Sequence, residues 1–371
     1  MFGVSRSARL ALALLFSCCG LCAQRVLIVD ASGGGDFRSI GPAVAAAAPG
    51  DHVVVRQGTY AENLEIDKGI ALVGEPGALI AATTIGGNLF VRDVPAGQAF
   101  RMRGFTLRGS FPGVFPFNCV LRDTLGLCVL QELYGDLIQP SLHIERCHQV
   151  ELRAIAWSDA TVVDSTLAAS TVVFESDNLW GLRCSGSVTL DRCVARGTTG
   201  AVPGAGIRVD NGRLTLTRTE VRAGALATYP QSAIDTLGGE VVLDPTVRLV
   251  PANGAPPVSG SGAVVMREVA SLGAASNGAR LEVELHGLSG SDFVILATRP
   301  APAVLPTSFG ELWLLAEDHV LVGFGSLRNS ARQRVLSIPH APVPAGYAIV
   351  LQAAQFAGGA LSLSSPAVAL F

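Results

Sequence analysis

The amino-acid sequence predicts an all-β protein: a right-handed parallel β-helix with an N-terminal capping helix, followed along the chain by a small antiparallel β-sandwich. Three observations predict this class. Residues 30–77 combine one short alanine-rich stretch with very short apolar strands that glycines separate. Residues 77–250 repeat short strand cores at intervals of roughly 18 to 28 residues, as expected for one coil per repeat. Beyond residue 250, apolar strands alternate with turns rich in Gly, Pro and Ser.

The first element is a helix expected between Ser39 and Ala48. Ser39 can act as its N-cap, and Pro42 falls in the first turn, where a missing N–H costs little. Ile40 and Val44 lie near a helical spacing and give the helix an apolar face. Because the first coil of a solenoid has an open apolar end, we expect this face to cover it.

Three strand cores follow the helix, at residues 53–55, 64–66 and 70–72, with turns expected at 58–60 and 68–69. Their inward side chains should form an apolar column beneath the helix. That column is expected to contain Val54, Leu64 and Leu72.

This stretch resembles the opening of the pectin-lyase-like β-helix superfamily, which includes pectin methylesterases, polysaccharide lyases and many non-enzymatic surface proteins. The resemblance implies the fold but says almost nothing of activity, because this part of the superfamily is scaffold. It is carried by Gly35-Asp36-Phe37, Ser39-Ile40, Pro49-Gly50-Asp51, Val53-Val54-Val55, Gly58-Thr59-Tyr60, Glu62-Asn63 and Leu72-Val73-Gly74.

The repeated strand cores share two or three alternating apolar positions and a polar corner. Inward Val, Leu and Ile would stack from coil to coil, because a single coil cannot bury that face alone. Two segments, Gly109–Pro116 and Gly197–Gly206, interrupt the repeat, and we expect them on the outside, where binding surfaces are usually built. The cores lie at residues 100–107, 119–123, 141–147, 161–165, 187–193, 213–219 and 240–246.

The last part of the chain is predicted to be a separate domain. The β-helix is expected over residues 24–250, a linker over 251–263, where Pro, Gly and Ser dominate, and a β-sandwich over 264–371. Its strands are expected at residues 280–285, 293–297, 311–315, 320–325, 334–338, 347–353 and 360–363. This domain is similar to the small all-β domain that ends many exported bacterial proteins, a resemblance that implies sorting, attachment or spacing. The resemblance is carried by Phe293–Ala297, Phe309–Trp313, Leu351–Ala353 and Leu361–Ser364.

Residues 1–23 have the pattern of a signal peptide. Arg6 and Arg9 form the charged region, residues 10–16 form an apolar run too short to span a bilayer, and the expected cut follows Ala23, just before Gln24. The protein is therefore expected to be secreted or held at the cell surface, without a transmembrane segment. A formal net charge of −3 and the lack of a basic run argue against nucleic acid as a partner.

Export makes disulfides possible, and the sequence leaves the state of the cysteines open. One alternative pairs Cys184 with Cys193 and Cys119 with Cys128, which are close in sequence. A second alternative places Cys147 and Cys193 in one stacked column. A third has all five as buried free thiols that pack like small apolar residues.

Two classes of function are compatible with this scaffold. The favoured one is an exported non-catalytic scaffold, with glycan binding or cell-surface association as its candidate role. Trp157 and Trp180 are the candidate binding residues, since an indole can stack on a sugar ring. Polysaccharide or a cell-surface glycan is the expected partner, and no cofactor is expected.

The alternative is a carbohydrate-active enzyme that acts on acidic polysaccharide. A lyase would need carboxylates that hold Ca²⁺ and an arginine that removes the proton α to the uronate carboxyl group. The candidate residues are Asp159, Asp164, Asp177, Asp191, Arg183 and Arg192, with Glu175 as a further acid. For a pectin-esterase-like enzyme, residues 123–125 and 131–134 faintly resemble a pectin methylesterase motif, with Gln131 as the implied oxyanion donor, but the rest of that family's pattern is missing.

Overall fold

The computed structural model divides the chain into two compact units, Arg25–Arg267 and a second unit that contains Glu268–Phe371. The structure describes residues 24–83, 89–108, 119–131, 133–135, 142–145, 147, 149–153, 156–157, 160–170, 172–175, 180–198, 204–224, 229–276, 279–327, 332–340 and 348–370. The predicted signal peptide, residues 1–23, and the predicted excursion Gly109–Pro116 lie outside them. Among the described residues, no helix is long and apolar enough to cross a membrane.

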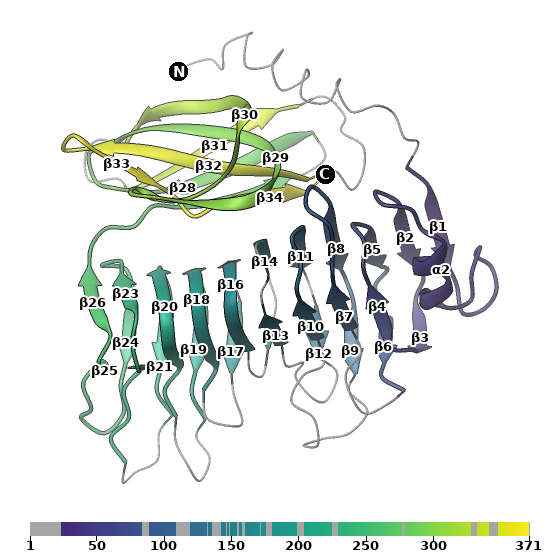
Figure 1. The fold of residues 1–371 in the computed structure, drawn as a ribbon, viewed down its shortest axis with the longest axis horizontal. Helices are drawn as coiled ribbons and strands as arrows, with labels where there is room; N and C mark the ends of the chain where they lie inside the picture. The colour runs from purple at the N-terminus through teal and green to yellow at the C-terminus, as the bar shows by residue number, and fades with distance from the viewer. Residues whose placement is uncertain are drawn as a thin grey trace. The chain divides into compact units, whose positions relative to one another are not determined.

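The first unit is a parallel β-helix, as the sequence predicts (Figure 1). Its elements are β1 (Val26–Val29), α2 (Ile40–Ala46), β2 (His52–Val55), β3 (Gly58–Ala61), β4 (Leu64–Ile66), β5 (Ala71–Gly74), β6 (Ala78–Ala81), β7 (Leu89–Arg92), β8 (Ala99–Arg103), β9 (Thr106–Arg108), β10 (Cys119–Arg122), β11 (Leu127–Gln131), β12 (Tyr134–Gly135), β13 (Leu142–Glu145), β14 (Gln149–Arg153), β15 (Ala156–Trp157), β16 (Ala160–Ser170), β17 (Val173–Glu175), β18 (Leu182–Asp191), β19 (Val194–Arg196), β20 (Ile207–Thr217), β21 (Glu220–Arg222), β22 (Ile234–Thr236), β23 (Glu240–Leu243), β24 (Arg248–Val250), β25 (Val258–Gly260) and β26 (Ala263–Met266).

Three parallel ladders form the walls of the β-helix. The first runs through β1, β2, β5, β8, β11, β14, β16, β18, β20, β23 and β26, and the second through β4, β7, β10, β13, β16, β18, β20, β22 and β25. The third wall consists of β3, β6, β9 and β12, then β15, β17, β19, β21 and β24. Figure 1 shows strands of consecutive coils side by side.

The long strands β16, β18 and β20 belong to both the first and the second ladder, and they bend between them. The pairing of β18 with β20 shifts register between Cys184 and Ser185. Just beyond this point Gly186 pairs with Gly212, and a Cβ on Gly212 would lie 2.1 Å from the carbonyl oxygen of Gly186. Glycine is required at this bend because the two backbones approach too closely for any side chain.

Alternation along each short strand builds the core. In β2, Val53 and Val55 are fully buried while Val54 is half-buried, and Val53 pairs with Leu72 of the next coil. The inward column therefore contains Val53, Leu64 and Leu72 rather than Val54, because successive side chains of a strand point to opposite faces. Residues 58–60, expected as a turn, begin strand β3 instead.

Helix α2 packs on this column as predicted, with Ile40 and Val44 buried in the same apolar cluster as Val53 and Leu64. Its cap differs from the prediction, because the Ser39 side chain makes no capping hydrogen bond. Instead, the Glu62 carboxylate accepts hydrogen bonds from the backbone N–H groups of residues 40 and 41, both at 2.7 Å. A carboxylate from the next coil thus satisfies the first N–H groups of the helix.

The predicted linker is part of the β-helix. Strand β25 pairs with β22, and β26 pairs with β23, so residues 258–260 and 263–266 form the last coil. The two compact units divide between Arg267 and Glu268. The linker was predicted from composition. In the structure, the glycines and serines of this segment occupy corners and short strands that pair with the neighbouring coil.

The second unit is an antiparallel β-sandwich whose two sheets share one apolar core, which includes Leu281, Val283, Phe293, Ile295 and Leu351. Its strands are β27 (Ser271–Ser276), β28 (Arg280–His286), β29 (Asp292–Thr307), β30 (Gly310–Ser326), β31 (Gln333–Pro339), β32 (Ala348–Ala357), β33 (Ala360–Leu363) and β34 (Ala367–Leu370). One sheet contains β27, β28 and β31, and the other contains β29, β30, β32, β33 and β34. The cores expected at 311–315 and 320–325 are one continuous strand, β30.

Candidate functional site

The outer face of the second ladder presents polar side chains in register. In β18, Leu182 and Cys184 are buried and Arg183 between them is exposed. Arg183 pairs with Arg208 of β20, Arg208 pairs with Asp235 of β22, and Asp235 pairs with Ser259 of β25. Parallel pairing without a shift places these four side chains in one outward row, one for each coil.

Around this row lies a group that we call the Trp180 cluster: Trp180, Arg183, Arg208, Asp210 and Asp235. Asp210 accepts a hydrogen bond from Nε of Arg183 at 2.5 Å and one from Nε of Arg208 at 2.9 Å. Arg208 also reaches Asp235, with 3.4 Å between Nη1 and Oδ2. Ion pairs across the coils therefore connect four charged side chains.

The indole of Trp180 lies just before β18 and contacts both arginines. The guanidinium carbon of Arg208 lies 4.6 Å from the centroid of the indole ring, and that of Arg183 lies 5.9 Å from it. Both distances are typical of cation–π contacts. Trp180 as a residue is half-buried.

The electrostatics around Asp210 favour its ionised form. Burial alone would raise the pKa of Asp210, but the hydrogen bonds from Arg208 and Arg183 outweigh it and hold that pKa below its ordinary value. The Asp210 and Asp235 side chains are 22% and 27% exposed, so ligand atoms can still reach them. The cluster is a surface of fixed donors, fixed acceptors and one aromatic ring, which suits binding.

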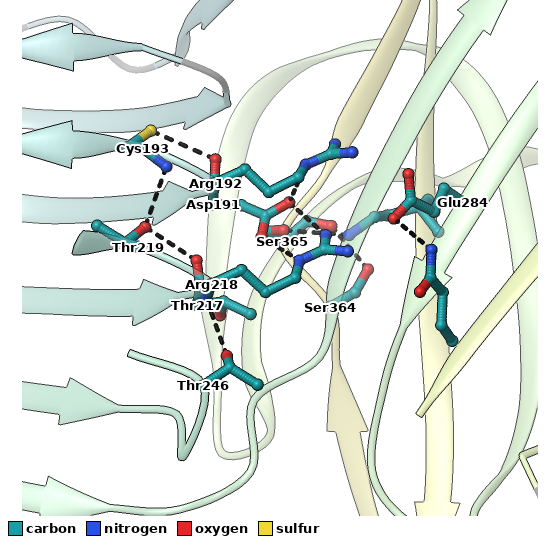
Figure 2. A network of polar contacts seen from close by, with 12 residues as sticks. Asp191, Arg192, Cys193, Thr217, Arg218, Thr219, Thr246, Glu284, Ser364 and Ser365 are labelled. Carbon is teal, nitrogen blue, oxygen red and sulfur yellow. Dashed lines mark hydrogen bonds and ion pairs between the residues drawn. The ribbon is translucent and has the colours of Figure 1, made fainter. Parts of the chain in front are cut away.

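A second polar group, which we call the Asp191 corner, lies where β18 ends (Figure 2). Asp191 accepts hydrogen bonds from Nε and Nη2 of Arg218 at 2.8 and 2.5 Å, and Nε of Arg192 lies 3.2 Å from its carboxylate. Arg192 and Arg218 occupy equivalent corner positions on successive coils, and both have left-handed backbones, with φ of 54° and 48°. Asp191 is only 4% exposed, and because Arg218 lies on the next coil, this ion pair holds two coils together.

The backbone around the Asp191 corner is hydrogen-bonded by threonines (Figure 2). Thr219 accepts a hydrogen bond from the N–H of Cys193 at 3.2 Å and donates one to the carbonyl oxygen of Thr217 at 2.9 Å. Thr246 accepts a hydrogen bond from the N–H of Arg218 at 2.9 Å. These bonds satisfy backbone groups at a tight turn, which is a structural role.

The structure separates the residues that the sequence suggested for a lyase. Arg183 belongs to the Trp180 cluster, whereas Asp191 and Arg192 belong to the Asp191 corner at the other end of β18. Asp164 lies in β16, Glu175 in β17 and Trp157 in β15, each placed by its backbone alone. Asp159 and Asp177 lie outside the described residues. Within the described part of the chain, no three His, Cys, Asp or Glu side chains converge to hold a metal ion.

Sequence reasoning missed Arg208, Asp210 and Asp235. The signal for them was present: Ile207-Arg208-Val209-Asp210 and Ile234-Asp235-Thr236 alternate between buried and outward positions. What the sequence lacked was the register between coils, which alone places an aspartate of one coil beside an arginine of another.

The five described cysteines are buried free thiols, which confirms the third alternative. The disulfide pairing was wrong for Cys184 and Cys193 because most of the extended strand β18 lies between them. Cys119 and Cys184 occupy inward strand positions and pair with Leu142 and Val209 of neighbouring coils. Burial raises the pKa of Cys184 and of Cys193 to about 12, so both thiols stay protonated and unreactive.

Comparison with known proteins adds little to this picture. No protein-family model matches the chain, and no curated protein sequence matches it. Among solved structures, one match is the crystal structure of the enzymatically active domain of tailspike protein 2 from bacteriophage CBA120. It is 7% identical in sequence with a TM-score of 0.28, and the match covers 83% of this chain and 69% of that one. A similarity of this degree bears on neither activity nor ligand.

Proposed function

We propose that this protein is an exported, non-catalytic β-helix scaffold that binds glycan through the Trp180 cluster. The observation that carries the proposal is the half-buried Trp180 beside two arginines and two aspartates that ion pairs hold in place. An aromatic ring offers a stacking surface, and fixed carboxylates and guanidinium groups offer acceptors and donors to hydroxyl groups. Such groups bind without reorganising, which lowers the entropic cost of association.

The catalytic alternative has less support. A lyase of this fold needs several carboxylates around Ca²⁺ beside an arginine base, and the two candidate arginines belong to different groups on β18. A glycosidase needs one carboxyl group with a raised pKa as its general acid. The pKa of Asp210 is lowered instead, which suits a permanent anion in a binding surface.

Export is the other part of the proposal. It rests on the signal-peptide pattern of residues 1–23. Mass spectrometry of the protein isolated from its native source should find a mature chain that begins near Gln24. An intact N-terminal segment in the mature protein would contradict export by this route.

The glycan proposal is tested by the change Trp180→Ala. Surface plasmon resonance on a panel of immobilised polysaccharides should show at least one bound by the parent protein. The variant should bind it about tenfold more weakly, which corresponds to ~1.4 kcal/mol. A matched control is Arg248→Ala, which removes a 67% exposed arginine that pairs with Glu220 on the third wall.

Two outcomes would contradict the proposal. Equal loss of binding in both variants would place the ligand elsewhere. Release of unsaturated uronate from a polysaccharide, or hydrolysis of its esters, by the parent protein would show that the scaffold is catalytic.

A further inference from the structure

The charges of the Trp180 cluster indicate which class of glycan it accepts, an inference that rests on the proposed function. The cluster contains two guanidinium groups and two carboxylates, and each guanidinium is paired with at least one carboxylate. Asp210 lies between Arg183 and Arg208, and Arg208 lies between Asp210 and Asp235. The formal charges cancel within the cluster, so it offers no excess of positive charge to an anion.

The hydrogen-bonding groups of the cluster suit hydroxyl groups. Each oxygen of Asp210 accepts one hydrogen bond from an arginine, and a carboxylate oxygen has a second lone pair for an O–H donor. Asp235 accepts one bond from Arg208 on Oδ2 and one from the Ser259 hydroxyl on Oδ1, both at 3.4 Å. A sugar hydroxyl can donate to such an oxygen and accept from a guanidinium N–H at the same time.

An acidic sugar would be disfavoured at the same place. Its carboxylate would have to displace Asp210 or Asp235 from the arginines, or approach two aspartates that are 22% and 27% exposed. The repulsion from the aspartates would offset the attraction to the arginines, and the ligand would still lose hydration. Further along the same wall, Arg92 of β7 is likewise paired with an acid, Glu65 of β4.

We propose that the Trp180 cluster binds uncharged glycan, such as a neutral hexose chain, and discriminates against uronate-containing chains through Asp210 and Asp235. The aspartates act as specificity-determining residues: they neutralise Arg183 and Arg208 and accept hydrogen bonds from sugar hydroxyl groups. Trp180 supplies the stacking surface.

The experiment uses the full-length mature protein and matched pairs of polysaccharides. Each pair is a uronate-containing polysaccharide and its carboxyl-reduced product, which keeps the chain and the linkages but removes the charge. Binding is measured by surface plasmon resonance at low and high NaCl. We expect the neutral member of a pair to bind at least about fivefold more tightly, with affinity changing less than about twofold between the two salt concentrations, since no net ionic attraction contributes.

The double change Asp210→Asn and Asp235→Asn should invert this preference. It leaves Arg183 and Arg208 without their partners, so affinity for the acidic member should rise about tenfold and become sensitive to salt. The matched control is Glu220→Gln, which removes an acid that also lies between two arginines, Arg222 and Arg248, but on the third wall. That variant should keep the parent's preference.

The outcomes separate this inference from the proposed function. Tighter, salt-sensitive binding of the acidic members by the parent protein, lost in Trp180→Ala, would overturn the inference and leave glycan binding intact. No binding in the panel that depends on Trp180 would overturn both. If circular dichroism shows that the double variant is unfolded, the parent protein still tests the inference through its preference between neutral and acidic polysaccharides and the salt dependence of its binding.

Discussion

The Trp180 cluster and the Asp191 corner lie at opposite ends of β18 and both contain aspartates and arginines, yet the structure assigns them different roles. Both join aspartates and arginines of neighbouring coils. At the Asp191 corner the carboxylate is 4% exposed and Arg218 holds it through two nitrogen atoms. In the Trp180 cluster the carboxylates are 22% and 27% exposed, and an indole lies beside them.

The comparison shows that an Arg–Asp pair says little about function until its burial is known. A buried carboxylate must be paired, because an unpaired buried charge costs several kcal/mol. Pairs that remain half-exposed contribute little to stability, typically about 0–1 kcal/mol. The exposed pairs are therefore available for recognition, while the buried pair is required by the fold.

The largest loss of stability is expected from a buried carboxylate that has no cationic partner. Val44→Asp would place a charge on the apolar column beneath helix α2, where Val44 is 5% exposed. We expect the β-helix to lose about 3 kcal/mol or more of unfolding free energy, measured by urea denaturation. Val26→Asp is the control, because Val26 is 57% exposed in the same unit and its change should have almost no effect. An unchanged midpoint in Val44→Asp would mean that α2 does not close the first coil.

A smaller effect is expected when a buried pair is broken. Arg218→Met keeps an unbranched apolar side chain but removes the guanidinium group and leaves Asp191 with Arg192, so the free energy of unfolding should fall by about 2 kcal/mol. Arg183→Met removes the half-exposed pair with Asp210 and should cost less than about 0.5 kcal/mol. Urea denaturation of both variants measures this difference directly. Equal losses of unfolding free energy in the two variants would contradict the prediction.

The smallest effect concerns pH. Because the pKa of Asp210 is lower in the folded protein than the ordinary value of 3.8, its ionised form stabilises the fold. That contribution is complete above the ordinary pKa and is lost as the pH falls through the lowered one, so it should disappear below about pH 4. Asp210→Asn should therefore lose less stability than the parent between pH 4 and pH 2. If Asp210→Asn instead lost more stability than the parent over this pH range, the prediction would be wrong.

The sequence predicted the architecture because the physical signals for it are local. Short strands with alternating apolar residues, and an alanine-rich helix with Ile40 and Val44 on one face, needed no knowledge of distant contacts. The sandwich was also predicted, although β30 was divided in two because its middle residues, Ala316, Glu317 and Asp318, have the composition of a polar turn. The predicted linker failed because Gly and Ser occur both in flexible segments and in the corners of a coil.

The sequence alone determined the fold class and the helix that covers the first coil, since both follow from spacing along one strand or helix. Only the tertiary structure decided which residues meet. Three contacts join residues of different coils: Arg208 with Asp235, the Glu62 carboxylate with the start of α2, and Arg218 with Asp191. The physical reason is that stacking fixes each coil against its neighbour, and residues about 20 to 30 positions apart become adjacent only once that stack has formed.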